Sequence, residues 1–464
     1  MADSEGFVHP YVPNAAPGPR RKLLDAIGVA DVAALYAAIP ADLRLAGRLD
    51  LPAPLPAEHD LRRHLEELLA RNRSAKDLLI FRGAGCYLHH VPALCDEITG
   101  RGEFLTAYAG GTYSDHGKNQ AVFEFQSLIG ELVGMDVVTP PTYDGGAAAN
   151  SAARMACRIT GRPGILVPAL MNPARLSQMR GFVKPTTTPV TVRQDPASGL
   201  IDLADLDARL GSGIGAVFIE QPSFLGVIET QVEAIADRVH RAGALLVVGV
   251  DPLALGVLAA PADWGADIVT GDIQPLGIHM QAGGGAAGFI ATRDEERFVA
   301  ELPTTLISAA PAEGGGLGFA WSTPERTSYD TRHEATDYYG TTQWLWGIGA
   351  AVYLSLMGPK GLAELAEGIM QRTAYAAGAL AGIKGVRVPH RDQALFREFV
   401  LDLGPSGRTV AQVDRALLEC GIVGGYDLSR ALPALGQAML VCVTEVHGKD
   451  DIDRLAGVLA AVLS

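Results

Sequence analysis

The fold is decided by the segment Leu245-Leu246-Val247-Val248-Gly249-Val250-Asp251-Pro252, in which an uninterrupted apolar run ends in an acid and a proline. A short run without polar alternation is typical of a strand that is buried on both faces. In an open α/β sheet, ligands bind at the carboxyl ends of such strands. Asp251 is therefore a candidate to pair with the protonated ring nitrogen of pyridoxal phosphate, although strand-end aspartates also serve as ordinary helix caps.

Similar apolar runs occur on both sides of this segment, and helical patterns separate them. They lie at residues 165–169, 190–192, 216–219, 268–270 and 288–291. This alternation predicts a mostly parallel sheet that is covered by helices on both faces. We therefore predict a large α/β domain over residues 76–325.

Two smaller parts flank this domain. Residues 1–75 are punctuated by prolines and resemble an N-terminal helical arm wrapped on a larger body. Its short helices are predicted at 20–27, 32–39 and 58–72. After residue 325, helices are predicted at 341–356, 360–380, 409–419 and 450–463, and strands at 398–403 and 438–443. These elements predict a small C-terminal α+β domain over 326–464, with the Gly-rich, polar segment 313–340 as the hinge.

Composition excludes several classes of protein. The chain has 464 residues, 48% of them hydrophobic, so it can bury a large core, and its net charge of −14 argues against a nucleic-acid partner. Five scattered cysteines suit reduced thiols and predict a cytoplasmic protein. The acidic, Pro-containing start does not resemble a secretory signal, and the apolar stretches 244–250 and 347–357 are too short to span a membrane.

Some motifs resemble nucleotide-binding or metal-binding sequences but favour an ordinary structural role. Gly283 to Gly288 fit the dinucleotide-binding string GxGxxG, but the glycines lead into a predicted strand, whereas nucleotide binding needs a helix after the turn. His89-His90 and His333-Glu334 lack the spacing of metal ligands, so we interpret them as surface or hydrogen-bonded residues and predict no metal site. His279 and His116 stay open as site residues because they lie in predicted loops near a domain junction.

The turn Tyr143-Asp144-Gly145-Gly146 precedes a helix of small residues. Such a turn can present N–H groups to a phosphate, and it can equally serve close packing of the helix on the sheet. A pyridoxal-phosphate enzyme also needs a lysine to form its internal Schiff base. None of the seven lysines falls within 269–288, where that lysine is expected. The predicted cofactor site therefore lacks the lysine that would bind the cofactor covalently.

The chain resembles subunit 1 of glycine decarboxylase, the P-protein of the glycine cleavage system, along nearly its whole length. The blocks that carry the resemblance include His9-Pro10-Tyr11-Val12-Pro13-Asn14, Phe123-Glu124-Phe125-Gln126, Gly134-Met135-Asp136-Val137, Gln221-Pro222-Ser223-Phe224-Leu225-Gly226, Gln274-Pro275-Leu276-Gly277 and Leu440-Val441-Cys442-Val443-Thr444-Glu445. The resemblance implies the fold of type I pyridoxal-phosphate enzymes, with a seven-stranded sheet in the large domain, a small C-terminal domain and an N-terminal arm.

The same resemblance implies that two different chains form the enzyme and that only one of them carries the cofactor. Gln274 falls where subunit 2 of the family carries the Schiff-base lysine, so pyridoxal phosphate is expected on a lysine-bearing partner of the same fold, in an α2β2 assembly. The family reaction decarboxylates glycine, a small amino acid, and transfers an aminomethyl group to the lipoyl arm of a carrier protein. This chain would complete the active site of its partner and would not be active alone.

Three segments depart from the family pattern. Residues 109–118 replace a Thr-Pro-Tyr-Gln-Pro-Glu-like loop, 331–338 replace an Arg-Arg-Glu-Lys-Ala-Thr-Ser-Asn run, and 284–288 replace a Gly-Gly-Pro-Tyr-Leu-Gly-like turn. These departures leave two alternatives open. The chain could belong to a diverged complex that uses another amino acid or another acceptor, or it could be a non-catalytic scaffold or regulatory subunit.

The predicted site residues follow from this resemblance. The loop that faces the composite site is predicted to present Tyr108, Tyr113, Asp115 and His116, with a solvated loop as the alternative. Tyr338, in the altered segment, is a further partner-facing candidate. The degenerate cofactor pocket is predicted to contain His279, Gln274, Asp144, Gly145 and Asp251, of which the two aspartates are expected to hold helix ends and turns.

Overall fold

The computed structural model describes residues 8–45, 47, 49–105, 118–183, 187–280, 287–322, 326–327, 337–340 and 342–464. Contacts between Cα atoms divide the chain into two compact units, Met1–Asn72 and Arg73–Ser464. The finer boundaries expected from the sequence, at residues 75 and 325, stay predictions. No helix among the described residues has both the length and the apolar composition needed to cross a membrane.

The first unit is made of short helices. It contains α1 (Pro17–Ile27), α2 (Glu58–Leu69) and the 3-10 turns Pro13–Ala15, Ala33–Tyr36 and Ala41–Leu43. The predicted helices at 20–27 and 58–72 are confirmed with shifted ends. The helix predicted at 32–39 is wrong, because this stretch forms a 3-10 turn whose Ala34 N–H is capped by Asp31 and which ends before Pro40. Leu24 is the one buried hydrophobic residue in the described part of this unit.

The second unit is built on a seven-stranded sheet. Its strands are β2 (Val137–Val138), β3 (Gly164–Pro168), β4 (Val190–Val192), β5 (Ile214–Gln221), β6 (Leu245–Val250), β7 (Ile268–Asp272) and β8 (Gly288–Thr292). They lie in the order β2-β8-β7-β6-β5-β3-β4. Strands β7, β6, β5, β3 and β4 pair in parallel, and β8 pairs antiparallel with both β7 and β2. The predicted mostly parallel sheet is confirmed.

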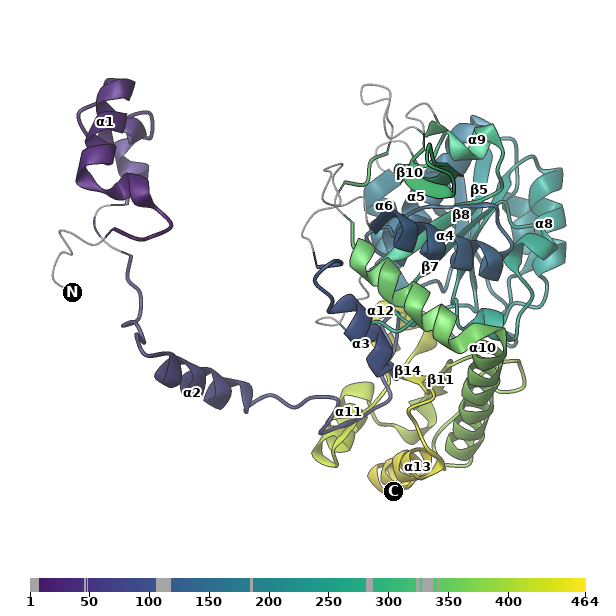
Figure 1. Cartoon of the computed structure of the whole chain (residues 1–464). Helices are drawn as coiled ribbons and strands as arrows, with labels where there is room; N and C mark the ends of the chain where they lie inside the picture. Colours follow the sequence, from purple (N-terminus) through teal and green to yellow (C-terminus); the bar gives the residue numbers. More distant parts are fainter. Residues whose placement is uncertain are drawn as a thin grey trace. The chain divides into compact units, whose positions relative to one another are not determined.

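Helices cover both faces of this sheet (Figure 1). The helices of this layer are α4 (Asn119–Val133), α5 (Gly145–Thr160), α6 (Pro173–Val183), α7 (Leu203–Arg209), α8 (Val232–Arg241), α9 (Glu296–Val299) and α10 (Trp344–Ala381). Residues of α4, α7, α8 and α10 form one buried cluster with Val217, Val248 and Val269. Residues of α5, α6 and α9 form another with Phe218, Val247 and Ile290. The apolar side chains of the inner strands β5, β6 and β8 are thus buried on both sides, as the unbroken apolar runs predict, whereas Val190 of the edge strand β4 is exposed.

The C-terminal part forms a smaller antiparallel sheet flanked by helices. Its strands are β11 (Glu398–Asp402), β13 (Tyr426–Asp427) and β14 (Ala438–Cys442), in the order β11-β14-β13. A separate parallel pair joins β1 (Leu79–Ile80) to β12 (Ile422–Val423). The remaining helices are α3 (Ala93–Thr99), α11 (Val410–Glu419), α12 (Leu428–Ala431) and α13 (Lys449–Leu463). The predicted strands at 398–403 and 438–443 and the helices at 409–419 and 450–463 are confirmed to within one residue at each end.

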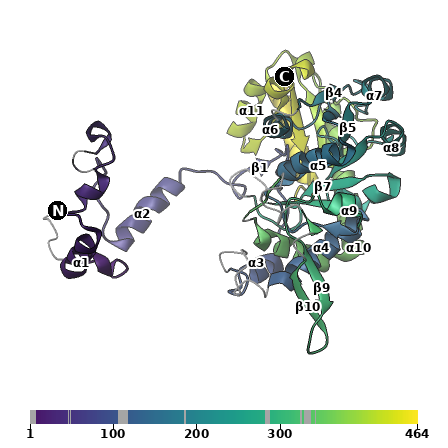
Figure 2. The ribbon, with the colours of Figure 1, turned by 90° about the horizontal axis from the view of Figure 1, so that it is seen from above.

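Two further features belong to the stretch of chain between the large sheet and the C-terminal sheet. The long helix α10 is interrupted at Gly358, whose φ of 59° is left-handed, and at Pro359. This break separates the two helices predicted at 341–356 and 360–380. The hairpin of β9 (Ile307–Pro311) and β10 (Leu317–Trp321) packs on α4, and Figure 2 shows it projecting from the unit. Residues 317–321 are therefore part of a strand and not of the hinge predicted at 313–340.

Candidate functional site

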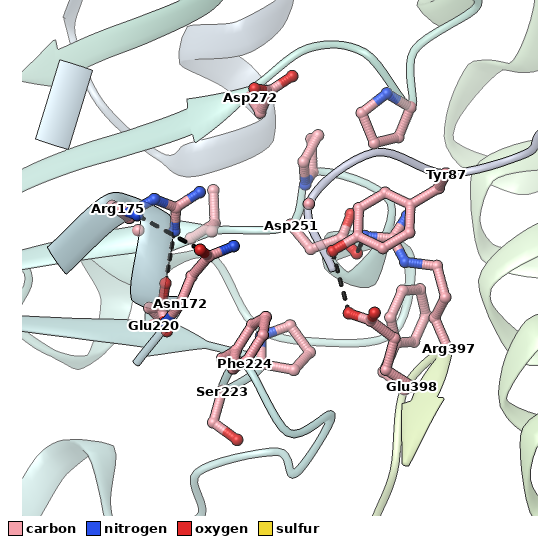
Figure 3. Close-up of a pocket in the computed structure, with 17 residues that line it drawn as sticks. Tyr87, Asn172, Arg175, Glu220, Ser223, Phe224, Asp251, Asp272, Arg397 and Glu398 are labelled. Carbon is pink, nitrogen blue, oxygen red and sulfur yellow. Dashed lines mark hydrogen bonds and ion pairs between the residues drawn. The ribbon is translucent and has the colours of Figure 1, made fainter. Parts of the chain in front are cut away.

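A small polar cavity lies at the carboxyl ends of β5, β6 and β7, the sheet edge at which Asp251 was predicted to act. Its volume is about 70 Å³. Its charged lining residues are Arg175, Glu220, Asp251, Asp272, Arg397 and Glu398. Figure 3 shows Arg175 and Glu220 on one side of the cavity and Arg397 and Glu398 on the other. The site thus draws on the large sheet and on the start of β11.

Asp251 forms a buried ion pair with Arg397. The guanidinium of Arg397 also lies over the ring of Tyr87, 3.3 Å from its centroid, and its Nη1 is 2.9 Å from Nε2 of His89. His89 in turn contacts the Glu445 carboxylate at 2.8 Å through Nδ1. Burial lowers the pKa of Arg397, but the attractions of Asp251, Tyr87, Cys442 and Glu398 together outweigh it and leave the pKa raised. The strand-end carboxylate is therefore already neutralised by a cation of this chain.

Glu398 holds the chain segment that precedes α3. Its Oε1 accepts a hydrogen bond from the Ala84 N–H at 2.7 Å, and its Oε2 accepts one from the Tyr87 hydroxyl at 3.0 Å. Burial raises the pKa of the Glu398 carboxyl to about 7. On the opposite wall, Arg175 donates to Glu220 at 2.6 Å, and burial raises the pKa of that carboxyl as well. Both walls consist of groups with partners inside this chain.

The N-terminus of α5 is occupied by two carboxylates. Asp144 is the N-cap and accepts a hydrogen bond from the Ala147 N–H at 2.6 Å. Asp272, at the end of β7, accepts one from the Gly145 N–H at 3.3 Å. A Cβ at position 145 would lie 3.0 Å from the Asp272 backbone nitrogen, so glycine is needed there for close packing. Burial raises the pKa of Asp272 to about 6. Asp144 and Gly145 therefore stabilise the start of α5. This agrees with the interpretation that their turn serves close packing of the helix on the sheet.

Gln274 is buried beside the cavity but is not among the residues that line it. Its Oε1 accepts a hydrogen bond from the Tyr87 N–H at 3.0 Å. Its Nε2 donates to the carbonyls of Tyr87 and Ile278 at 3.1 and 3.0 Å. The amide at the expected lysine position thus fastens the Tyr87 segment to the loop after β7.

The residues of this site do not fit pyridoxal phosphate. Binding pockets for molecules of that size measure about 300 to 1,000 Å³, well above the cavity found here. The carboxylate that should pair with the pyridine nitrogen is bound by Arg397, and the helix N-terminus that should bind phosphate carries Asp144 and Asp272. Four carboxylates against two guanidinium groups in the lining also disfavour an anion. The ion pair between Asp251 and Arg397 connects the end of β6 in the large sheet to the start of β11 in the C-terminal sheet, and we assign no chemical step to these residues.

The remaining predicted site residues lie apart from this cavity. His279 is exposed and its Nε2 is 2.9 Å from the Asp96 carboxylate, so it does not line the cavity as expected. Tyr338 is 63% exposed and follows Asp337, which is buried in ion pairs with Arg154 and Arg158. Tyr108, Tyr113, Asp115 and His116 lie outside the described residues.

Sequence reasoning missed most of the groups that build the site. Arg397 and Glu398 stand at the start of an apolar strand, and Glu220 and Asp272 stand at the carboxyl ends of two others. A charged residue at the end of a buried strand indicated Asp251 as a site residue. The same signal is present at these four residues and could have indicated them as well. Within the described ranges, no three His, Cys, Asp or Glu side chains are grouped closely enough to hold a metal ion.

Comparison with known proteins identifies the family. The family model of the glycine cleavage system P-protein matches residues 11–459. The chain belongs to the glycine cleavage system P-protein family. Two P-protein relatives, each named as probable glycine dehydrogenase (decarboxylating) subunit 1, are 37% identical to it. The protein from Moorella thermoacetica is matched over 98% of this chain and 100% of its own length, and that from Aeropyrum pernix over 98% and 99%.

Solved structures agree with this assignment to the P-protein family. An inhibitor-bound crystal structure of glycine decarboxylase (P-protein) of the glycine cleavage system superposes with a TM-score of 0.84 at 33% identity, covering 98% of this chain and 100% of that one. A NifS-like protein superposes with a TM-score of 0.62 at 13% identity over 83% of this chain and 99% of its own, which supports the fold alone. The predicted α/β fold of type I pyridoxal-phosphate enzymes and the predicted family are confirmed.

Proposed function

We propose that this chain is the non-lysine subunit of a pyridoxal-phosphate-dependent, glycine-decarboxylating complex and that it completes the active site of a lysine-bearing partner of the same fold. One observation carries the proposal: Asp251, which should pair with the cofactor ring, is bound by Arg397 of the same chain. The replacement of the anchoring lysine by the hydrogen-bonded Gln274 supports it. Relatives named as subunit 1 are consistent with the need for a second chain.

The proposal extends to the assembly and its substrates. We expect an α2β2 complex in the cytoplasm, with glycine as the substrate and the lipoyl arm of a carrier protein as the acceptor. The partner-facing residues are proposed to be Tyr108, Tyr113, Asp115, His116 and Tyr338. Of these, Tyr338 lies within the described residues, exposed beside Tyr339, whose hydroxyl donates to the Ala147 carbonyl at 2.7 Å.

The proposal is tested by reconstitution with a lysine-bearing homologue encoded beside the gene. The mixture is expected to catalyse exchange of bicarbonate into the glycine carboxyl group, whereas the chain alone shows neither exchange nor a borohydride-reducible adduct with pyridoxal phosphate. Tyr338→Ala is expected to lower exchange at least tenfold without weakening assembly. The control Tyr375→Ala removes another exposed tyrosine, on α10, and should change exchange less than twofold. A stoichiometric adduct on the isolated chain would contradict the proposal.

A second candidate is a diverged complex that acts on another amino acid or another acceptor. The departures at 109–118 and 331–338 favour it, because both segments were predicted to lie near substrate or partner. The same exchange assay with serine and alanine in place of glycine separates the two. Exchange confined to an amino acid other than glycine favours the diverged complex, and an unchanged rate with and without this chain favours a scaffold or regulatory role.

A further inference from the structure

A second, larger cavity lies on the hairpin side of the sheet, away from the site described above. Its volume is about 640 Å³. Its walls are α4, strand β9 and β2, the outermost strand of the large sheet. Phe123, Met135, Leu306 and Ile307 supply apolar surface. A groove of this size, bounded by two strands that each end a sheet, can accept a segment of another polypeptide.

The register of the hairpin turns one edge of β9 away from β10, and no other described residue pairs with that edge. At its two ends, the Ser322 N–H donates to the Leu306 carbonyl and the Ala312 N–H donates to the Gly316 carbonyl. Hydrogen-bonded pairs alternate with non-bonded pairs in an antiparallel ladder, so Ile307 and Ala309 fall at non-bonded positions opposite Trp321 and Phe319. Their N–H and C=O groups point away from β10. Residues 306–309 also line the cavity, so these groups are available for strand addition there.

The charge of the rim indicates what kind of segment fits. Glu131, Asp136 and Asp294 line the cavity, and Arg326, which pairs with Asp294, is the one cation among the described lining residues. The net negative charge favours a segment that carries lysine or arginine. Because this chain has a net charge of −14, an acidic segment would be repelled.

We infer that a basic, extended segment of the lysine-bearing partner subunit adds to β9 as an antiparallel or parallel strand. The inference rests on the proposed function, because it takes the second subunit as the occupant. Main-chain bonds to Ile307 and Ala309 supply the affinity, and a basic side chain at the acidic rim supplies the specificity. The groove is thus an attachment point for the partner on the hairpin side of the chain.

Amide-resolved hydrogen–deuterium exchange tests this inference on the wild-type chain, alone and in the reconstituted complex. The amides of Ile307 and Ala309 are expected to exchange at least tenfold more slowly in the complex. The amide of Phe319, at the outer edge of β10, serves as the internal control and is expected to change less than twofold. Protection of Ile307 and Ala309 in the isolated chain would overturn the inference, because the groove would then be filled by this chain or by a second copy.

A pair of proline variants provides an independent measurement. Ala309→Pro removes an outward N–H without breaking a bond to β10, and it is expected to weaken partner binding about tenfold. Leu317→Pro is the matched control at a non-bonded position of β10 and should weaken binding less than twofold. If an active complex forms while neither protection nor the Ala309→Pro effect is seen, the inference fails and the proposed function stands. If no lysine-bearing homologue binds, both fail.

Discussion

At the scale of single residues, Arg397 determines how the carboxyl end of β6 is used. Its side chain is almost fully buried and is held by the Asp251 carboxylate and the face of Tyr87. A buried ion pair owes its stability to the balance between desolvation and attraction, so loss of one partner leaves an uncompensated charge. The same pair that excludes the cofactor ring is therefore also a structural element of this chain.

Replacing this arginine should reveal that dependence. Arg397→Met leaves Asp251 buried without a cation and is expected to lower the free energy of unfolding by about 3 to 5 kcal/mol, measured by urea denaturation. The double variant Arg397→Met/Asp251→Asn is expected to recover most of the loss. Arg387→Met, which breaks the more exposed pair with Asp402, should cost less than about 1 kcal/mol. Equal losses for both single variants would contradict the assignment.

Glu398 predicts a pH dependence of stability. Its pKa rises from an ordinary 4.5 to about 7 on burial, so the folded protein binds the proton more tightly than the unfolded chain. The resulting stability is present below about pH 4.5 and is lost as the pH rises through about 7, up to about 3 kcal/mol in all. Glu398→Gln is expected to flatten this part of the curve of unfolding free energy between pH 5 and 8. A variant curve parallel to the wild-type curve would contradict the prediction.

At the scale of elements, strands were easier to predict than the contacts at their ends. The strands at 190–192 and 245–250 were predicted to the residue. For 245–250 the reason is burial on both faces, which leaves an unbroken apolar run, and the edge strand 190–192 carries two β-branched valines. The two-residue strand β2 is too short to carry such a signal, and the hairpin strands expose small or apolar residues, so they show neither burial on both faces nor a polar alternation. Short edge strands are specified by the partner that they pair with and not by their own composition.

The N-terminus of α5 supplies a prediction at this scale. Asp144→Ala removes the side chain that caps the Ala147 N–H and is expected to lower the free energy of unfolding by about 0.5 to 2 kcal/mol in urea denaturation. Asp144→Asn keeps an acceptor at the same position and should lose much less. If Asp144→Ala is as stable as Asp144→Asn, the cap has no structural role.

At the scale of the whole molecule, three separate features of this chain do not fit pyridoxal phosphate. They are the small cavity, the pairing of Asp251 with Arg397, and the carboxylates at the start of α5. Restoring one group should therefore not restore binding. The site consequently differs from a cofactor pocket that has merely lost its lysine, which is how it was predicted from the sequence.

This difference can be tested by Gln274→Lys. The variant is expected to form no borohydride-reducible adduct with pyridoxal phosphate and to unfold at lower temperature than the wild type, because it loses the hydrogen bonds to Tyr87. Absorbance after reduction and a thermal melt measure the two effects. A stoichiometric adduct on this variant would show that the missing amine alone explains the loss of cofactor binding.

By itself, the sequence determined the layered α/β fold, the family and the absence of a lysine from residues 269–288, because these depend on local apolar patterns and on residue identity. The tertiary structure alone decided that Asp251 meets Arg397, that Asp272 reaches the start of α5, and that β9 and β2 line the same groove. These contacts join segments far apart along the chain. Which partner a charged side chain meets depends on how the sheets pack, and no local pattern encodes that choice.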